Sequence, residues 1–399
     1  MPSLAFMPDA TITLPGAIVR EETVAVAWPL WLASLGLVCA AAGLYWDVSW
    51  HLSIGRDTFW TPAHVLIQLC GVFAGVGCGA LIVTATLRKR DDAVRVLGLR
   101  GPLGAFVACW GGAAMATSAP FDDWWHNAYG LDVKVLSPPH VLLASGVVVV
   151  GAGVLLLIAA ETNRATGASR ERLEQHLLGL GTLLLSMMAV FSIEHTGTTP
   201  FAGARFMHTP QFYSVLCVAF PWLLVALAAS SNGRSGRRFA ATSVAALWMA
   251  LWTGALWLVP LVRAEPKLGP VYTPITHLVP LGFPLLLVAP ALAVDLLGAR
   301  LFARGFAVRA VALGAGFLAA ALLAQWPLGS LLTTRAASGW VFGASNYSYL
   351  TRPADYHRFH ELVAPAPGFW RGMLLALAFS IVGSAAGLGL GDLLRRVRR

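Results

Sequence analysis

The stretch DVSWHLSIGRDTFWTPAH, residues 47–64, joins two long apolar segments of the sequence. It contains Asp47, then His51 four residues later and His64 thirteen residues after that. Four residues make about one helical turn, so Asp47 and His51 share a face if this end of the first segment is helical. Pro62 suits the first turn of the next helix, which would direct His64 back toward the pair. A carboxylate and two imidazoles that converge in this way predict a site for copper, zinc or iron.

The composition of the chain places this stretch in a membrane protein. Of the 399 residues, 57% are hydrophobic and only 12% are charged, too few charges to cover the surface of a soluble protein. Several apolar runs exceed the roughly 20 residues that cross a bilayer. The first run, 24–45, is too long for a cleavable secretion signal and follows the mixed segment 20–22. We therefore predict an all-α fold, a polytopic transmembrane helical bundle in contact with lipid.

About ten membrane helices are expected, arranged as repeated two-helix hairpins. The expected ranges are 24–45, 63–87, 101–121, 139–160, 176–195, 210–231, 239–262, 273–297, 308–326 and 370–392. We divide the chain into a metal-site half, residues 1–175, and an additional membrane half, residues 176–399, with a long outer loop at 327–369. Five cysteines lie inside apolar runs without paired loop spacing, which favours small buried residues over disulfides or metal thiolates: Cys39, Cys70, Cys78, Cys109 and Cys217.

The distribution of charge predicts the orientation of the helices. Although the net charge is +9, 19 of the 28 basic residues lie in alternate short loops and at the two termini. The positive-inside rule then places both termini in the cytoplasm, for a multi-pass protein of the cell inner membrane, and this distribution argues against nucleic-acid binding. Nine of the ten histidines fall on the opposite, extracytoplasmic side. The exception, His176, is interpreted as an ordinary residue at a helix end.

A second motif repeats the pattern of the first. Asp122 is followed by His126 after four residues and by His140 after a further fourteen. Asp123 is adjacent to Asp122 and could replace it as a ligand. Two copies that join the outer ends of consecutive helices make coincidence less credible, so a second metal site is predicted. The alternative at both places is an interfacial loop in which the acid and the histidines hydrogen-bond one another.

A third pair of histidines gives a weaker pattern. His195 and His208 are again thirteen residues apart, and Glu194 stands beside the first of them. However, Phe191 occupies the position four residues before His195, where the other motifs have an acid. A third metal site is therefore a weaker candidate, and a polar cap or a pore-lining role remains as its alternative.

The first motif also resembles the metal-site signature of the C subunit of particulate methane and ammonia monooxygenases. That family uses an Asp and two His as copper ligands within the membrane, and carries a nearby Asn-x3-His-x13-His site. Asp122, His126 and His140 match the second spacing, with Asp in the place of Asn. The resemblance covers about residues 25–160. The residues that carry it in the first motif are Asp47, Trp50, His51, Arg56, Asp57, Thr58, Thr61, Pro62, His64 and Val65.

The resemblance implies a copper protein that activates oxygen and hydroxylates a small apolar substrate. It also implies partner subunits, an electron donor and an oligomer, which in that family is a trimer. The chain departs from the family in continuing for about 240 residues past the second motif, and nothing in it resembles the cupredoxin-like domains of the B subunit. Arg56 and Asp57 are expected to orient the ligands of the first site. Two alternatives stay open: a membrane protein that handles or transports copper or zinc without catalysis, and a structural membrane subunit.

Overall fold

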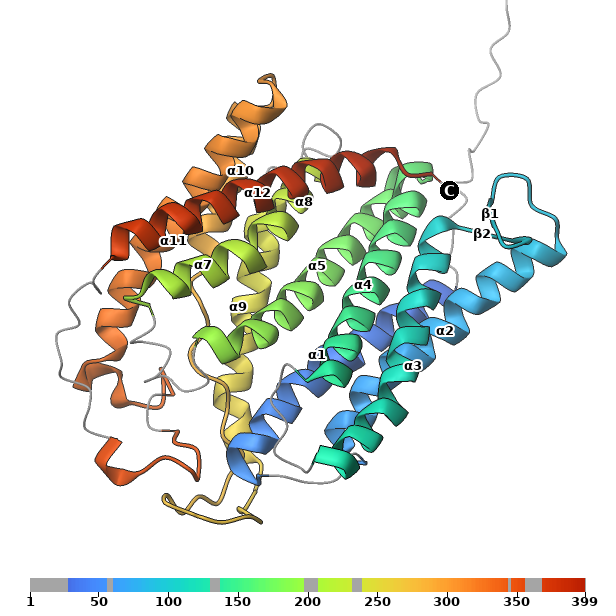
Figure 1. The fold of residues 1–399 in the computed structure, drawn as a ribbon. Helices are drawn as coiled ribbons and strands as arrows, with labels where there is room; N and C mark the ends of the chain where they lie inside the picture. The colour runs from blue at the N-terminus through green and yellow to red at the C-terminus, as the bar shows by residue number, and fades with distance from the viewer. Residues whose placement is uncertain are drawn as a thin grey trace, which may run out of the picture.

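Long helices make up most of the fold (Figure 1). The computed structural model describes residues 28–55, 60–129, 137–196, 207–231, 239–343, 346–355 and 368–398. Its α-helices are α1 (Trp28–Ser53), α2 (Pro62–Leu87), α3 (Leu103–Tyr129), α4 (Pro138–Arg164), α5 (Gly167–Thr196), α7 (Pro210–Ala219), α8 (Pro221–Ser231), α9 (Ala240–Leu258), α10 (Val288–Arg300), α11 (Phe306–Leu332) and α12 (Phe369–Arg396). Short 3₁₀ helices occupy Val259–Leu261, Arg335–Ser338 and Pro353–Asp355. The all-α prediction is confirmed.

Eight spans in the described part of the chain are long and apolar enough to cross a bilayer. They are α1, α2, α4, α5, the pair α7 and α8, α9 with its 3₁₀ extension, α11 and α12. Pro221 divides the pair, because a proline inside a helix removes one backbone donor. The protein is therefore a multi-pass membrane protein. Of the ten predicted membrane helices, those corresponding to α3 and α10 are not among these eight.

The predicted helix at 273–297 is wrong over its first half. Helix α10 begins only at Val288, and the preceding residues 262–287 follow an irregular path. Its 13 residues span about 20 Å, less than the roughly 30 Å hydrocarbon core of a bilayer. The segment is apolar enough to suggest a helix, but prolines remove donors and push the preceding residues out of the helical region. These prolines are Pro266, Pro270, Pro274, Pro280 and Pro284.

The boundaries of two helices in the second half of the chain also need correction. Helix α5 begins at Gly167, not at residue 176, so His176 lies inside the helix. There its ring stacks on Trp31 and its Nε2 atom lies 2.9 Å from the hydroxyl of Ser34, which is a packing role within the bundle. Helix α11 continues through Pro327 to Leu332, so the connection to α12 is shorter than the predicted loop 327–369. The cysteines are all free, as predicted.

The alternating direction of the helices gathers the two motifs at one end of the bundle. The last turns of α1 and α3 and the first turns of α2 and α4 lie together there (Figure 1). Helices α3 and α4 approach closely, since a Cβ atom added at Gly104 would lie 2.4 Å from the carbonyl oxygen of Gly153. Helix α5 packs against α1 and α4 on one side and against α7 and α9 on the other. The division of the chain at residue 175 stays a prediction.

The opposite end carries three connections that contain arginine, residues 88–102, 164–167 and 300–306, and the C-terminal end of α12 (Figure 1). One of these connections is a two-stranded antiparallel hairpin, β1 (Val94–Val96) with β2 (Leu99–Gly101), which the sequence analysis did not anticipate. Leu97 and Gly98 both have positive φ angles, as the tight two-residue turns of β-hairpins require.

Candidate metal centres

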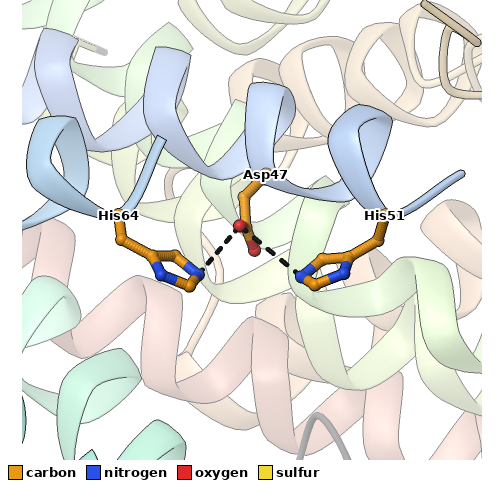
Figure 2. Close-up of side chains that lie close together, drawn as sticks. All are labelled: Asp47, His51 and His64. Carbon is orange, nitrogen blue, oxygen red and sulfur yellow. Dashed lines mark ion pairs between the residues drawn. The ribbon is translucent and has the colours of Figure 1, made fainter. Parts of the chain in front are cut away.

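The first centre joins the end of α1 to the start of α2. The Nε2 atom of His64 lies 3.0 Å from Oδ1 of Asp47, and the Nε2 atom of His51 lies 3.7 Å from the same oxygen. Figure 2 shows the two rings pointing toward the carboxylate from opposite sides. The side chains of Asp47 and His64 are mostly buried, whereas that of His51 is 46% exposed. The site is therefore open to the surface of the protein at the side of His51.

Local sequence explains how these three side chains meet. Helix α1 continues past residue 45 to Ser53, which places Asp47 and His51 on one face, one turn apart. Helix α2 starts at Pro62, and the side chain of Thr61 accepts a hydrogen bond from the backbone N–H of His64 at 3.4 Å. This N-terminal cap fixes the first turn and, with it, the direction of the His64 ring.

The second centre has the same construction between α3 and α4. The Nε2 atom of His140 lies 3.2 Å from Oδ1 of Asp122, and the Nε2 atom of His126 lies 3.5 Å from Oδ2. Asp122 and His126 occupy the last two turns of α3, which extends to Tyr129 beyond its predicted end at 121. His140 follows Ser137 by three residues, as His64 follows Thr61. The Asp122 side chain is only 10% exposed, less than half the value for Asp47.

These distances fit the coordination of one metal ion in each centre. Two ligand atoms at about 2.0 Å from a tetrahedral ion lie roughly 3.3 Å apart. The Asp–His distances of 3.0 to 3.7 Å bracket that value, and the three ligand atoms of each centre lie within 4.8 Å of one another. Hydrogen bonds between carboxylate and imidazole account for the 3.0 and 3.2 Å pairs, whereas the 3.5 and 3.7 Å pairs are longer than ordinary hydrogen bonds. In the second centre the two imidazoles approach different oxygens of Asp122. Each group has a geometry that could hold one metal ion.

The other residues singled out in the sequence do not join these centres. His208 is buried, and its Nε2 atom lies 3.1 Å from the hydroxyl of Ser330 while its ring contacts Trp326, both on α11. Its predicted pairing with His195 stays a prediction. Asp123 accepts a hydrogen bond from Asn127 through its backbone oxygen and is not part of the ligand group. Other predicted residues lie outside the described residues: Arg56 and Asp57 entirely, and Glu194 and His195 by their side chains.

Hydrogen bonds between α1 and the segment 262–287, which the sequence analysis missed, support the helix that carries Asp47 and His51. The irregular segment 262–287 packs along the face of α1 that turns away from the ligands. The hydroxyl of Ser49 donates to the carbonyl of Val279 at 2.7 Å, and the N–H of Val279 donates to the hydroxyl of Ser53 at 2.6 Å. One turn earlier, the phenol oxygen of Tyr45 accepts from the N–H of Leu281 at 3.2 Å. No local pattern in the sequence indicates these contacts, because the partners lie more than 200 residues apart.

Backbone hydrogen bonds extend this support to the very end of α1. The N–H of Lys267 donates to the carbonyl of Ile54 at 2.8 Å, and the N–H of Tyr349 donates to that of Leu52 at 3.3 Å. Both carbonyls belong to the terminal turn, whose oxygens have no partner within the helix itself. The second half of the chain therefore provides hydrogen-bond donors for the terminal carbonyl groups of the helix that carries Asp47 and His51.

Comparison with known protein families, with curated proteins and with solved structures finds no match to the chain. The resemblance to the monooxygenase C subunit therefore rests on its motif residues and stays a prediction. The geometry contributes a separate observation, which is that both Asp-His-His sets converge. The two centres lie at the same end of the bundle, and α1 and α4, which carry ligands of different centres, pack against each other.

Proposed function

We propose that the protein is a membrane copper protein that binds one ion at Asp47, His51 and His64 and a second at Asp122, His126 and His140. The observation that supports the proposal is the convergence of two equivalent ligand sets at one end of the bundle. Neutral imidazoles suit copper and zinc alike, and two imidazoles with one carboxylate leave coordination positions for oxygen or substrate. Copper is preferred because the motif residues resemble those of a copper family.

We further propose that the copper sites support oxygen-dependent hydroxylation of a small apolar molecule that arrives through the lipid. Copper would supply the redox chemistry. In the overall reaction, a C–H bond becomes C–OH with one atom of dioxygen. The other oxygen atom leaves as water, which requires two electrons and two protons from an external electron donor. The chain's own ligands hold the ions, and the 46% exposed His51 lies where the centre opens to the outer end of the bundle.

The arrangement of charges supports an orientation for this function. The described connections that contain arginine, residues 88–102, 164–167 and 300–306, lie at the end of the bundle opposite the two ligand sets. With those connections and both termini in the cytoplasm, the ligands face the extracytoplasmic side of the cell inner membrane. An oligomer with other monooxygenase-type membrane subunits and an electron donor would complete the system.

Metal content per chain, measured by mass spectrometry together with copper EPR on protein in nanodiscs, tests the proposal. We expect up to two copper ions per wild-type chain. His51→Ala/His64→Ala should remove one ion and His126→Ala/His140→Ala the other, because removal of two of three ligands leaves no chelate. His176→Gln changes a histidine of the same protein outside both centres and should retain the full content.

Three results would count against the proposal. Zinc in place of copper would contradict the choice of metal and favour a zinc-handling protein. A wild-type chain that stays metal-free after copper is added would contradict both centres. Copper that binds but gives no oxygen-dependent product from small hydrocarbons, with an electron donor and partner subunits present, would leave a copper-handling protein.

A further inference from the structure

A cavity of about 170 Å³ lies at the end of the bundle away from the metal centres, where the β-hairpin joins α2. The first turn of α1, the last turns of α2 and α4, and the start of the hairpin region form its walls. The deeper wall is apolar and includes Leu30, Leu81 and Leu157, one from each of these three helices. The cavity is thus built from helix ends that lie far apart in the sequence.

The rim of this cavity is cationic. Arg88, Arg90 and Arg164 line it together with two acids, Asp92 and Glu161, so the lining carries one net positive charge. Arg90 holds Asp92 through two hydrogen bonds of 2.9 and 2.5 Å, and this pairing lowers the pKa of the Asp92 carboxyl. Asp92 therefore stays ionised, and the hydrogen bonds that Arg90 donates to it are not available to a ligand.

The other two arginines of the rim, Arg88 and Arg164, make weaker or fewer ion pairs than Arg90 does. Arg164 pairs with Glu161 and lies 4.0 Å from Asp92, at the long limit of an ion pair. Arg88 forms no ion pair with any acid in the described part of the chain, and it is exposed. An anion with several acceptor oxygens would complete this arrangement, because a guanidinium binds phosphate through two parallel hydrogen bonds.

The cavity also lies at the level where lipid headgroups are expected. On α2, the apolar side chains Val83 and Leu87 are 55% and 78% exposed, as in a surface that faces acyl chains. Thr84, between them, lines the cavity, and Arg88 follows Leu87 directly. The surface changes there from apolar to cationic within one helical turn. Basic pockets between membrane helices on the positively charged side are typical binding sites for anionic lipid headgroups.

We propose that this cavity binds an anionic phospholipid, with its phosphate at Arg88 and Arg164 and its glycerol region against the apolar wall. A dry cavity of about 150 Å³ holds a molecule the size of benzene. A volume of about 170 Å³ therefore admits the part of the lipid next to the headgroup, and not the whole molecule. The acyl chains lie in the bilayer along the exposed side of α2.

Native mass spectrometry of the full chain tests this assignment. Delipidated protein is titrated with phosphatidylglycerol and with phosphatidylcholine of the same acyl chains, and separately with inorganic phosphate. We expect the anionic lipid to bind more tightly. Arg88→Gln should weaken its binding about fivefold, the contribution of one arginine near a membrane surface. Thr84→Trp, which fills the mouth of the cavity, should weaken binding of both lipids.

Arg95→Gln is the control, because Arg95 is an exposed arginine on strand β1, which follows α2 and Arg88 in the chain, and it does not line the cavity. It should leave lipid binding within about twofold of the wild type, and equal thermal midpoints should show that all variants are folded. Equal binding of the two lipids, or equal losses in Arg88→Gln and Arg95→Gln, would overturn the assignment. Displacement of phosphatidylglycerol by millimolar inorganic phosphate would instead make this a site for free phosphate.

Discussion

The two metal centres share a ligand pattern but differ in how the protein holds them. At the first centre, the end of α1 is tied to residues 262–287 and to Tyr349 by hydrogen bonds that cross more than 200 residues of sequence. At the second centre, the hydrogen bonds of Ser118 and Asn127 stay within α3. Instead, an aromatic group of Phe121, Trp124, Trp125 and Tyr129 packs on itself at the end of that helix.

This difference shows that one spacing can be supported in two ways. The second centre depends on a closely packed helix pair, in which α3 and α4 meet backbone to backbone. The first centre depends in addition on the second half of the chain, which gives residues 176–399 a role in positioning Asp47 and His51. The carboxylate of the second centre is also more buried, because the Asp122 side chain is 10% exposed and that of Asp47 is 22% exposed. Variants that affect one centre and spare the other test the comparison.

The largest effect is expected from neutralising the carboxylates. Asp122→Asn and Asp47→Asn keep the shape of the ligand but remove its charge. The interaction of a carboxylate with a divalent ion is less screened where the site is more buried. Loss of a residue that only hydrogen-bonds to a metal ligand costs roughly 10- to 100-fold in metal affinity. Because Asp122 is itself a proposed ligand, we expect copper affinity at the second centre to fall by at least this factor. The loss at the first centre should be smaller.

Competition with a chelator of known copper affinity measures each site when the other has been removed by its two His→Ala substitutions. Asp123→Asn, next to the second centre but outside its ligand group, serves as the control and should leave the affinity unchanged. A larger loss for Asp47→Asn than for Asp122→Asn would show that burial of the carboxylate does not rank the two centres.

A smaller effect is expected from loosening the support of α1. Ser53→Ala removes the acceptor of the buried Val279 N–H, which should cost about 1–3 kcal/mol of stability. Because the helix end then holds Asp47 and His51 less firmly, copper affinity at the first centre should fall by about tenfold, while the second centre keeps its affinity. The thermal midpoint and site-resolved copper titration give the two quantities.

Ser118→Ala is the matched control for this variant. Ser118 is equally buried, but its hydroxyl donates to the carbonyl of Met115 within α3, so its removal leaves no backbone donor unpaired. It should lower stability less than Ser53→Ala does. If Ser53→Ala weakened both centres equally, the hydrogen bonds to Val279 would be a general packing feature and not a support of the first centre.

The ligands could be predicted from sequence because their geometry is local. Asp47 and His51 are one helical turn apart, and a Pro two residues before His64 starts the next helix. The support of α1 could not be predicted, since Val279 lies 226 residues from Ser53 and no periodicity connects them. The apolar composition of residues 273–287 predicted a helix. In the structure, the prolines of residues 262–287 prevent one, and the segment follows an irregular path. That path leaves backbone N–H and C=O groups available to α1.

The smallest effect should distinguish the two helix starts that present His64 and His140. Thr61 caps α2 by accepting a hydrogen bond from the N–H of His64, whereas Ser137 makes no side-chain cap bond to α4. Thr61→Ala should therefore cost about 1 kcal/mol of stability, and Ser137→Ala close to none. Because the cap orients the turn that carries His64, Thr61→Ala should also lower copper affinity at the first centre by a few fold. Equal shifts of the thermal midpoint in the two variants would show that the caps contribute alike, and the difference between the centres would then rest on the burial of Asp122 and the support of α1.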